Sequence, residues 1–443
     1  MMRISQSLTN KKETEHGAVI HIERRMRGQL RRRRKIMKQI TGGVTAAKGY
    51  KAAATAAGIK YQDRTDMAMV YSEVPATVAG TFTTNVFKAA PVIWDRNIVK
   101  KTGKAQAVVV NSGIANACTG EEGDLYCQKT ADAAAEALGI SADAVLLGST
   151  GVIGMQLPVD KMQAGAKKLA TLLDDSIEAG SAAAQAIMTT DTHKKEIAYE
   201  LTIGGKTVTI GGMAKGSGMI HPNMCTMLAY VTTDAAISHE MLQKALSQIV
   251  VDTFNMISVD GDTSTNDTLL VLANGMAGNT EIVAEGSDYD QFYEALNAIC
   301  TFLAKEMAAD GEGATKLVES IVEGADTKEN ARILAKSVVC SSLTKAAMYG
   351  CDANWGRELC ALGYSGVQFD PMKVEMYFKS GDTTMLIFKD GAGVDYSEEE
   401  AAKLLANDHV QIISKMNMGT ESATAWGCDL TYDYVKINAD YRS

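Results

Sequence analysis

The sequence is poor in proline, tryptophan and histidine, and it contains no long apolar run. Of its 443 residues, 5 are proline, 3 are tryptophan and 6 are histidine. No stretch reaches the roughly 18 apolar residues that a helix needs to cross a bilayer, so no membrane span is predicted. The eight cysteines have neither C-x-x-C spacing nor a clustered histidine partner, which argues against a disulfide framework and a zinc site. We therefore expect reduced, mostly buried thiols in a cytoplasmic protein.

Positive charge is scarce outside the first 36 residues. Residues 1–36 hold 11 Lys or Arg against 3 Glu, whereas the rest of the chain holds 33 basic and 50 acidic residues. An acidic body of this kind argues against nucleic-acid binding. We interpret residues 1–36 as a disordered basic leader or as the product of a start codon placed too early, since Met37 opens the run MKQITGGVTAAKGY. A nucleic-acid patch or an organellar transit peptide is the alternative.

Short β-like runs and amphipathic helices alternate along the remainder, which predicts an α+β fold with helices outside paired sheets. The patterns predict strands early in the chain, including PVIW at 91–94 and AQAVVVNSG at 105–113. They also predict a strand at the end of the chain, at 423–439. Between these parts, the patterns predict helices at 128–139, 160–175, 176–190, 238–257, 288–311 and 328–348, and a hairpin at 195–213.

The stretch KGSGMIHPNMCTMLAYVTT, 215–233, places the hydroxyl of Thr226 between a flexible approach and a buried strand. Gly216 and Gly218 supply backbone freedom, Pro222 fixes a bend, and the strand follows at once. Such a threonine is by default only a β-former. If the Cys225 carbonyl met the hydroxyl, however, an acyl shift could cut the chain and give Thr226 a free α-amine. That amine could then act as the base for its own hydroxyl.

The other motifs give weaker evidence for a functional site. DGDTSTND at 260–267 crowds three aspartates, but the glycine and the closing Glu of a calcium loop are misplaced, and no Walker or dinucleotide fingerprint is present. We therefore expect no metal site. Cys225 could rival Thr226 as nucleophile, with His221 as its one nearby partner. We expect His221 to support the loop or to pack within the fold.

Several ordered motifs resemble the ornithine acetyltransferase family, also called glutamate N-acetyltransferase. The resemblance covers about Met37 to Ser443 and departs from the family at Cys225, where alanine is more usual. The motifs are ITGGVTAAKGY at 40–50, NSGIANACTG at 111–120, LLGSTGVIG at 146–154, AIMTTDTHKK at 186–195, GMIHPNMCTML at 218–228, VDGDTSTNDT at 259–268, LAKEMAADGEGATK at 303–316 and INADYRS at 437–443.

The resemblance implies a self-cleaving enzyme with a layered α/β/β/α sandwich of the N-terminal-nucleophile type. Cleavage between Cys225 and Thr226 would give an α segment, 37–225, and a β segment, 226–443, that stay associated as a heterotetramer. Thr226 would carry the acetyl group of N2-acetylornithine to glutamate in a ping-pong reaction, and Thr150 and Gly151 would stabilise the oxyanion.

The substrate-binding set that the resemblance implies is Thr192, Lys215, Thr226, Glu306, Asn438 and Ser443. Lys215 would meet a carboxylate and Glu306 the ornithine ammonium. The partners are then small molecules, without nucleic acid or membrane, and no metal or organic cofactor is expected. Acetyl-CoA is a second potential acetyl donor, because family members differ in its use. Two alternatives stay open at this point: a self-cleaving amidohydrolase or aminopeptidase that transfers to water, and a non-catalytic amino-acid-binding protein on the same scaffold.

Overall fold

The computed structural model describes residues 37–221 and 227–440. Its larger sheet has nine strands in the order β1-β6-β7-β8-β10-β3-β4-β5, with β2 paired to β3. In chain order these strands span Met37–Ile40 (β1), Tyr50–Thr55 (β2), Met67–Phe82 (β3), Lys104–Ile114 (β4), Val145–Val152 (β5), Lys195–Ile203 (β6), Lys206–Lys215 (β7), Leu228–Thr233 (β8) and Thr268–Ala273 (β10). The helices of the same body span Ala90–Lys101 (α2), Glu122–Leu138 (α3), Val159–Thr171 (α4), Ile177–Ala186 (α5), His239–Asp252 (α6) and Ser287–Ala309 (α7).

Strand β3 is long enough to belong to both halves of this sheet. Its first part pairs with β2 and β4, and its last part pairs with β10. The ladder shifts register between Tyr71 and Ala76, and such irregularities bend a strand. The halves come into contact: the Tyr230 hydroxyl on β8 occupies the space that a Cβ at Gly148 on β5 would need. In a flat sheet these strands, four places apart, would be separated by about 19 Å, so the sheet is folded over on itself.

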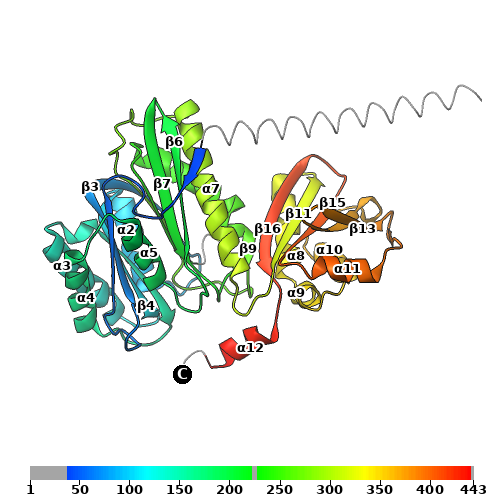
Figure 1. The fold of residues 1–443 in the computed structure, drawn as a ribbon, viewed down its shortest axis with the longest axis horizontal. Coiled ribbons are helices and arrows are strands. Elements are labelled where there is room, and N and C mark those ends of the chain that lie inside the picture. The colour runs from blue at the N-terminus through cyan, green and yellow to red at the C-terminus, as the bar shows by residue number, and fades with distance from the viewer. Residues whose placement is uncertain (1–36, 222–226, 441–443) are drawn as a thin grey trace, which may run out of the picture.

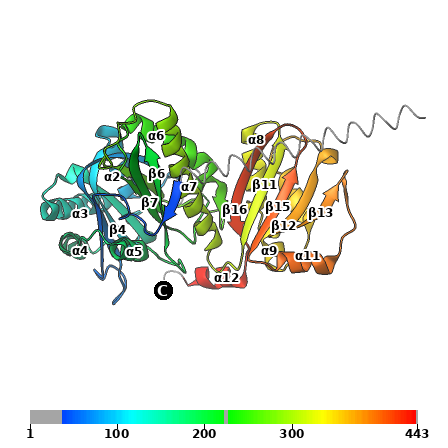
Figure 2. The ribbon, with the colours of Figure 1, turned by 45° about the horizontal axis from the view of Figure 1, so that its top comes forward.

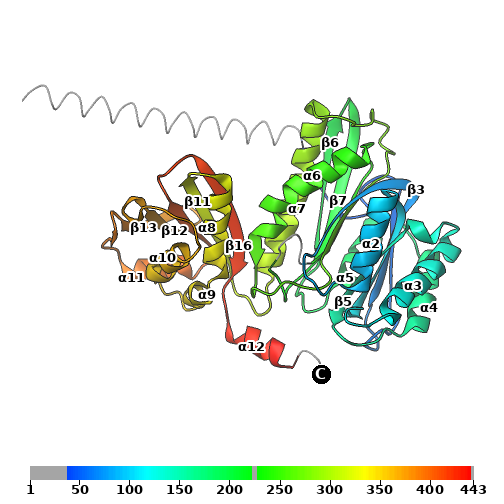
Figure 3. The same ribbon diagram turned by 180° about the vertical axis from the view of Figure 1, so that it is seen from behind.

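The layers follow from this bend. Apolar side chains fill the space between the two halves, among them Val70, Val108, Leu146, Leu228 and Leu270. The outer face of the β2–β5 half packs against α3 and α4. On the outer face of the other half, α7 packs against β6 and β7, and α6 packs against β3; Figure 3 shows both helices from behind. The predicted α/β/β/α layering is therefore confirmed.

The C-terminal half forms a smaller second body around a seven-stranded sheet in the order β14-β13-β12-β15-β11-β16-β9. Helix α8 packs on β11 and β16, and α7 also contacts β16. Helix α7 thus lies between the two bodies (Figures 1 and 2). The strands are Ile257–Ser258 (β9), Leu317–Ala325 (β11), Glu375–Ser380 (β12), Thr383–Lys389 (β13), Ala392–Gly393 (β14), His409–Lys415 (β15) and Glu421–Cys428 (β16); the helices are Lys328–Cys340 (α8), Ser342–Tyr349 (α9), Trp355–Gly363 (α10) and Glu398–Leu405 (α11).

Two strand predictions are wrong. PVIW lies in helix α2, where Pro91 occupies the first turn and lacks only an N–H that a helix start leaves unpaired anyway. The predicted strand 423–439 stops at Cys428, and α12 (Tyr432–Ala439) follows, because the Thr431 side chain accepts the Tyr434 N–H and caps a new helix. Helix α12 returns beneath the junction of the two bodies (Figure 1).

The two predicted segments interleave within the larger sheet. Strands β8 and β10, which follow residue 226, lie between β7 and β3, which precede it. Both borders are continuous backbone ladders. A cut between 225 and 226 would therefore leave two pieces joined through one sheet, while the cut itself falls outside the described residues and stays a prediction. Within the described ranges, no helix is long and apolar enough to cross a membrane.

Candidate active site

A cavity of about 290 Å³ opens where β5 and β7 end and β8 begins. Its walls come from both predicted segments and from α12. It is lined by Ala115, Thr150, Gly151, Val152, Ile153, Thr189, Thr190, Lys215, Gly216, Gly218, Met219, Ile220, Met227, Leu228, Ser264, Asn266, Asp267, Glu312 and Asn438. Of the predicted site residues, the structure thus brings together Thr150, Gly151, Lys215 and Asn438.

Thr150 and Gly151 lie near the C-terminal end of β5, opposite Ser112 and Gly113 of β4. Gly151 has a φ of +130°, which strongly favours glycine. A Cβ at this position would overlap the backbone carbonyl of Gly113. Glycine therefore lets the two strands approach at the cavity wall, where a hydroxyl and exposed backbone are the kinds of group that can stabilise an oxyanion.

Lys215 ends β7 with a buried side chain beside a buried carboxylate. Its Nζ lies 3.8 Å from Asp191 Oδ2. Asp191 also accepts the Gly216 N–H at 2.7 Å and pairs with Lys195 Nζ at 2.8 Å. Burial raises the pKa of the Asp191 carboxyl, but Lys215 and Lys195 outweigh it and hold that pKa well below its usual range. Asp191 is therefore ionised and fixes the Lys215 ammonium at the wall, where it can receive a ligand carboxylate.

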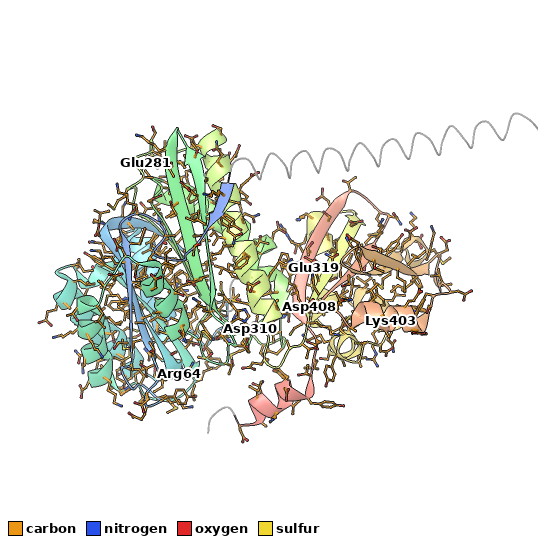
Figure 4. The ribbon with its side chains drawn as sticks, in the orientation of Figure 1. Arg64, Glu281, Asp310, Glu319, Lys403 and Asp408 are labelled. Atoms are coloured by element: carbon orange, nitrogen blue, oxygen red, sulfur yellow. The ribbon has the colours of Figure 1, made fainter. Side chains whose placement is uncertain are left out.

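Asp310 lies where α7 ends (Figure 4), and it connects that helix to the Lys215–Asp191 pair through Lys195. Its carboxylate pairs with Lys195 Nζ at 2.5 Å and accepts from the Thr192 hydroxyl and backbone N–H. The Ser217 hydroxyl donates to the Asp310 carbonyl at 2.7 Å. Buried charges and hydrogen bonds thus hold together three segments that meet at the cavity: residues 191–195, the end of β7 with Ser217, and the end of α7. Thr192 itself is turned into this network and does not line the cavity.

Glu306 lies one turn earlier on α7, near the surface. Its Oε2 is 3.3 Å from His193 Nε2, and its side chain is 36% exposed. Glu306 does not line the cavity. The structure therefore places this predicted ammonium ligand beside the buried network, at its exposed side.

Asn438 reaches the cavity from α12. Its side-chain amide donates to Glu312 Oε2 at 2.7 Å, and the Thr431 hydroxyl, at the start of α12, donates to the Gly313 carbonyl at 2.7 Å. A Cβ at Gly313 would come within 2.7 Å of the Tyr434 nitrogen, so α12 and the 311–313 turn are closely packed. Helix α12 therefore contributes to the cavity wall through Asn438, while a role of Asn438 in substrate binding stays a prediction.

Asn266 and Asp267 line the cavity although the sequence reasoning did not assign them a role. Asn266 donates to the carbonyls of Ala115 and Ser149 at 2.5 and 2.8 Å. Asp267 is 1% exposed, and among the described residues its Oδ2 has no hydrogen-bond partner. Burial raises the pKa of Asp267 well above its usual range. A buried carboxyl, with one oxygen that has no partner in the described part of the chain, therefore lies in a cavity that also contains Lys215.

One pattern in the sequence could have indicated that Asp267 lies at the site. Strands β8 and β10 are parallel, with Leu228 opposite Thr268, and the Thr268 N–H donates to the Met227 carbonyl at 2.7 Å. The residues that precede the two strands therefore lie side by side. The sequence shows two apolar strands, β8 and β10, each preceded by a polar run. If the strands are assumed to pair in parallel, these polar runs are expected to lie close together.

Thr226, Cys225 and Ser443 lie outside the described residues. The described residues on both sides of 222–226 lie at the cavity, since Met219, Ile220 and Met227 all line it. His221 does not line the cavity, and its Nδ1 lies 3.1 Å from Ser258 Oγ. Burial and the charge of Lys336 lower the pKa of His221 to about 4, so this ring is neutral near pH 7 and suits a supporting role.

The fold and this cavity define a protein that binds a small molecule. A pocket in which hydroxyl, ammonium, amide and carboxyl groups converge among apolar walls is the usual form of a small-molecule site. The sequence pattern of the ArgJ family matches residues 51–443. The arginine biosynthesis bifunctional protein ArgJ of Symbiobacterium thermophilum is 53% identical over 409 residues, which cover 92% of this chain and all of that protein. The chain belongs to the ArgJ family, and it is an acetyltransferase of arginine biosynthesis.

Two solved structures are similar to parts of the chain. ArgJ from Bacillus halodurans is 48% identical, with a TM-score of 0.45, and the match covers 47% of this chain and 96% of that one. An ornithine acetyltransferase from Mycobacterium tuberculosis, solved in complex with ornithine, is 41% identical, with a TM-score of 0.40, and the match covers 42% of this chain and 98% of that one.

Proposed function

We propose that the enzyme transfers an acetyl group from N2-acetylornithine to glutamate through an ester on Thr226. The observation that carries this proposal is the convergence at one cavity of Met227, the residue after Thr226, with Thr150, Gly151 and Lys215. Chain connectivity keeps residue 226 next to Met227. The nucleophile, a candidate oxyanion site and a carboxylate-binding cation would then act on one small substrate.

In the first half-reaction the Thr226 hydroxyl attacks the acetyl carbonyl of N2-acetylornithine. The α-amine of Thr226 takes the hydroxyl proton, the amide C–N bond breaks, and the proton passes to the departing ornithine amine. In the second half-reaction the glutamate amine attacks the ester carbonyl, a C–N bond forms, and the ester C–O bond to Thr226 breaks. The attacking amine loses a proton to the Thr226 α-amine, which passes it to the Thr226 oxygen. Lys215 would bind the α-carboxylate of either substrate, and Thr150 and Gly151 would stabilise the oxyanion in both steps.

This scheme needs a free amine on Thr226, so we propose that the chain first cuts itself. The Thr226 hydroxyl attacks the Cys225 carbonyl, the acyl group moves from nitrogen to oxygen, and water then hydrolyses the ester. The shared sheet supports continued association of the two pieces, and we propose a cytoplasmic heterotetramer of two α and two β segments. Asn438 and Ser443 complete the proposed substrate contacts at the cavity, whereas Thr192 and Glu306, which lie beside it, would contact only a part of the substrate that extends beyond the cavity wall. No metal or organic cofactor enters the scheme, and acetyl-CoA would be an alternative acetyl donor.

A two-part experiment tests the proposal. A denaturing gel of the purified protein should show two fragments that divide at 225/226, and incubation with N2-acetylornithine and glutamate should yield N-acetylglutamate and ornithine. Thr226→Ala should give one uncut, inactive chain, whereas the matched control Thr383→Ala, at an exposed strand position, should behave as wild type. Release of acetate without N-acetylglutamate would identify a hydrolase, and an uncut, inactive wild type would identify a binding protein; either result contradicts the proposal.

A further inference from the structure

The loop between β9 and β10, residues 259–267, contains the aspartate-rich run DGDTSTND. Its first aspartate contacts the backbone that leads toward the proposed cleavage point. Asp260 accepts the Met219 N–H through Oδ2 at 2.6 Å and the Ile220 N–H through Oδ1 at 2.9 Å. Met219 has a φ of +55°, which is unfavourable for a residue with a side chain. Both oxygens of Asp260 therefore hold a strained backbone in place.

The same loop also binds the next stretch of this backbone. The Val259 N–H donates to the Ile220 carbonyl at 2.7 Å, and the Thr263 hydroxyl donates to the His221 carbonyl at 2.8 Å. Ile220 and Thr263 also form an antiparallel bridge. The backbone is thus held up to His221, the last residue that the structure describes before 222–226.

The far end of the loop leads to a hydrogen bond that holds the backbone beyond the proposed cleavage point. The Thr268 N–H, where β10 begins, donates to the Met227 carbonyl at 2.7 Å. Asn266 fastens the loop to the cavity wall, because its side-chain amide donates to the Ser149 carbonyl at 2.8 Å, one residue before Thr150. A single loop and its junction with β10 therefore hold the chain on both sides of that point, beside the end of β5.

We propose that Asp260 is a positioning residue for the self-cleavage, and that the β9–β10 loop holds the chain so that the Thr226 hydroxyl meets the Cys225 carbonyl. This inference rests on the proposed function. In the step that it assists, the Thr226 oxygen bonds to the Cys225 carbonyl carbon, the C–N bond between the two residues breaks, and the hydroxyl proton passes to the released amine. Because the loop fixes the chain on both sides, less conformational entropy is lost when the two groups meet.

Loss of these hydrogen bonds should slow the cut without moving it. Asp260→Ala removes both acceptors and should lower the rate of cleavage by about 10- to 100-fold, since a small misplacement of reacting groups has effects of this size. Asp260→Asn keeps one acceptor oxygen and should lose less. Thr263→Val removes only the donor to the His221 carbonyl and should also slow the cut. Asp370→Ala is the matched control, because Asp370 also accepts a backbone N–H, that of Met372, in the smaller body; it should cut at the wild-type rate.

Denaturing gels measure the conversion of the full-length chain into two fragments over time after a short pulse of synthesis, and circular dichroism checks that each variant folds. A parallel series contains hydroxylamine at neutral pH, which cleaves an ester but leaves the peptide bonds intact. Hydroxylamine should not restore the rate of Asp260→Ala, because this variant is slowed before the ester forms. A merely structural weakening would not place the defect at that step.

Two results would overturn the role of Asp260 while the self-cleavage stands. If the wild type cuts and Asp260→Ala and Thr263→Val cut at the same rate, the loop does not position the bond. If hydroxylamine restores Asp260→Ala to the wild-type rate, the loop acts on hydrolysis of the ester and not on the attack. A wild-type chain that stays uncut would refute the self-cleavage and the role of Asp260 together. Should Asp260→Ala fail to fold, Asp260→Asn and Thr263→Val decide by the same criteria.

Discussion

The Lys215 ammonium lies 3.8 Å from the Asp191 carboxylate, and both side chains are buried. The pair does not stand alone, since Asp191 shares Lys195 with Asp310. Two buried cations are thus balanced by two buried anions, and the network fixes the cavity wall at the place where we expect the substrate carboxylate. A buried network of this kind is costly to break at any one member.

Asp191→Asn should therefore weaken both stability and substrate binding. Loss of this charge leaves Lys195 and Lys215 with one carboxylate, which should cost roughly 3–5 kcal/mol of unfolding free energy and raise the KM for N2-acetylornithine. Denaturant unfolding and steady-state kinetics check this result. The control is Glu399→Gln, which removes a carboxylate from the exposed pair with Lys403 and should cost less than about 1 kcal/mol. Equal effects of the two substitutions would mean that the buried network does not position Lys215.

Gly151→Ala should abolish most activity. A Cβ would overlap the Gly113 carbonyl at the cavity wall, which should displace Gly151 and Thr150 and lower kcat by roughly 10²- to 10³-fold. Gly154→Ala is the matched control, since Gly154 also has a positive φ of +81° but no atom within 4 Å of a Cβ. The control should cost about 1 kcal/mol in stability and keep its kcat. Comparable kcat values for the two variants would contradict the role of Gly151.

Asp267→Asn should be neutral or stabilising while it lowers activity. Because the folded-state pKa of Asp267 is raised, its contribution to stability is lost as the pH rises above the unfolded value near 4. The amide removes this loss and keeps the shape of the side chain. Its effect on activity should be strong because the carboxyl, unlike the amide, can take up and release a proton at the cavity. Thermal unfolding and the pH profile of kcat separate the two effects. A less stable variant with an unchanged pH profile would refute this account.

Periodicity alone predicted most of the helices and strands but little of the site, and the α/β/β/α layering came from the family resemblance. The helix that ends at Gly139, where the φ of +68° closes it, and the hairpin closed by Gly204 and Gly205 were readable from local patterns. The contact between Lys215 and Asp191 could not be predicted from local patterns, because it depends on the order of strands in a folded-over sheet. Asn438 was predicted through resemblance alone. Its segment was predicted as a strand because Thr431 and Tyr432 favour strands by propensity, whereas in the structure the Thr431 side chain caps a helix. The site thus depends on long-range pairing that local propensity does not encode.

Glu358 should make stability depend on pH in the smaller body. Both of its carboxylate oxygens are buried, and neither has a hydrogen-bond partner among the described residues. Burial raises the pKa of Glu358 to about 8. Between about pH 4.5 and 8 the unfolded chain ionises this group and the folded chain does not, so stability should fall as the pH rises through that window.

Glu358→Gln should remove this fall and be more stable at pH 8 by an amount on the order of 4 kcal/mol. Denaturant unfolding at pH 5 and pH 8 measures the difference, with Glu398→Gln, at an exposed helix start, as the control. If wild type and Glu358→Gln lost the same stability between the two pH values, the carboxyl would be ionised in the folded protein.

The most direct test of the central claim is the intact mass of the protein after brief exposure to N2-acetylornithine without glutamate. We expect two chains that divide between Cys225 and Thr226, with the C-terminal chain heavier by one acetyl group that fragmentation places on Thr226. Addition of glutamate should remove that group. A single full-length mass, or an acetyl group on any residue other than Thr226, would contradict the account.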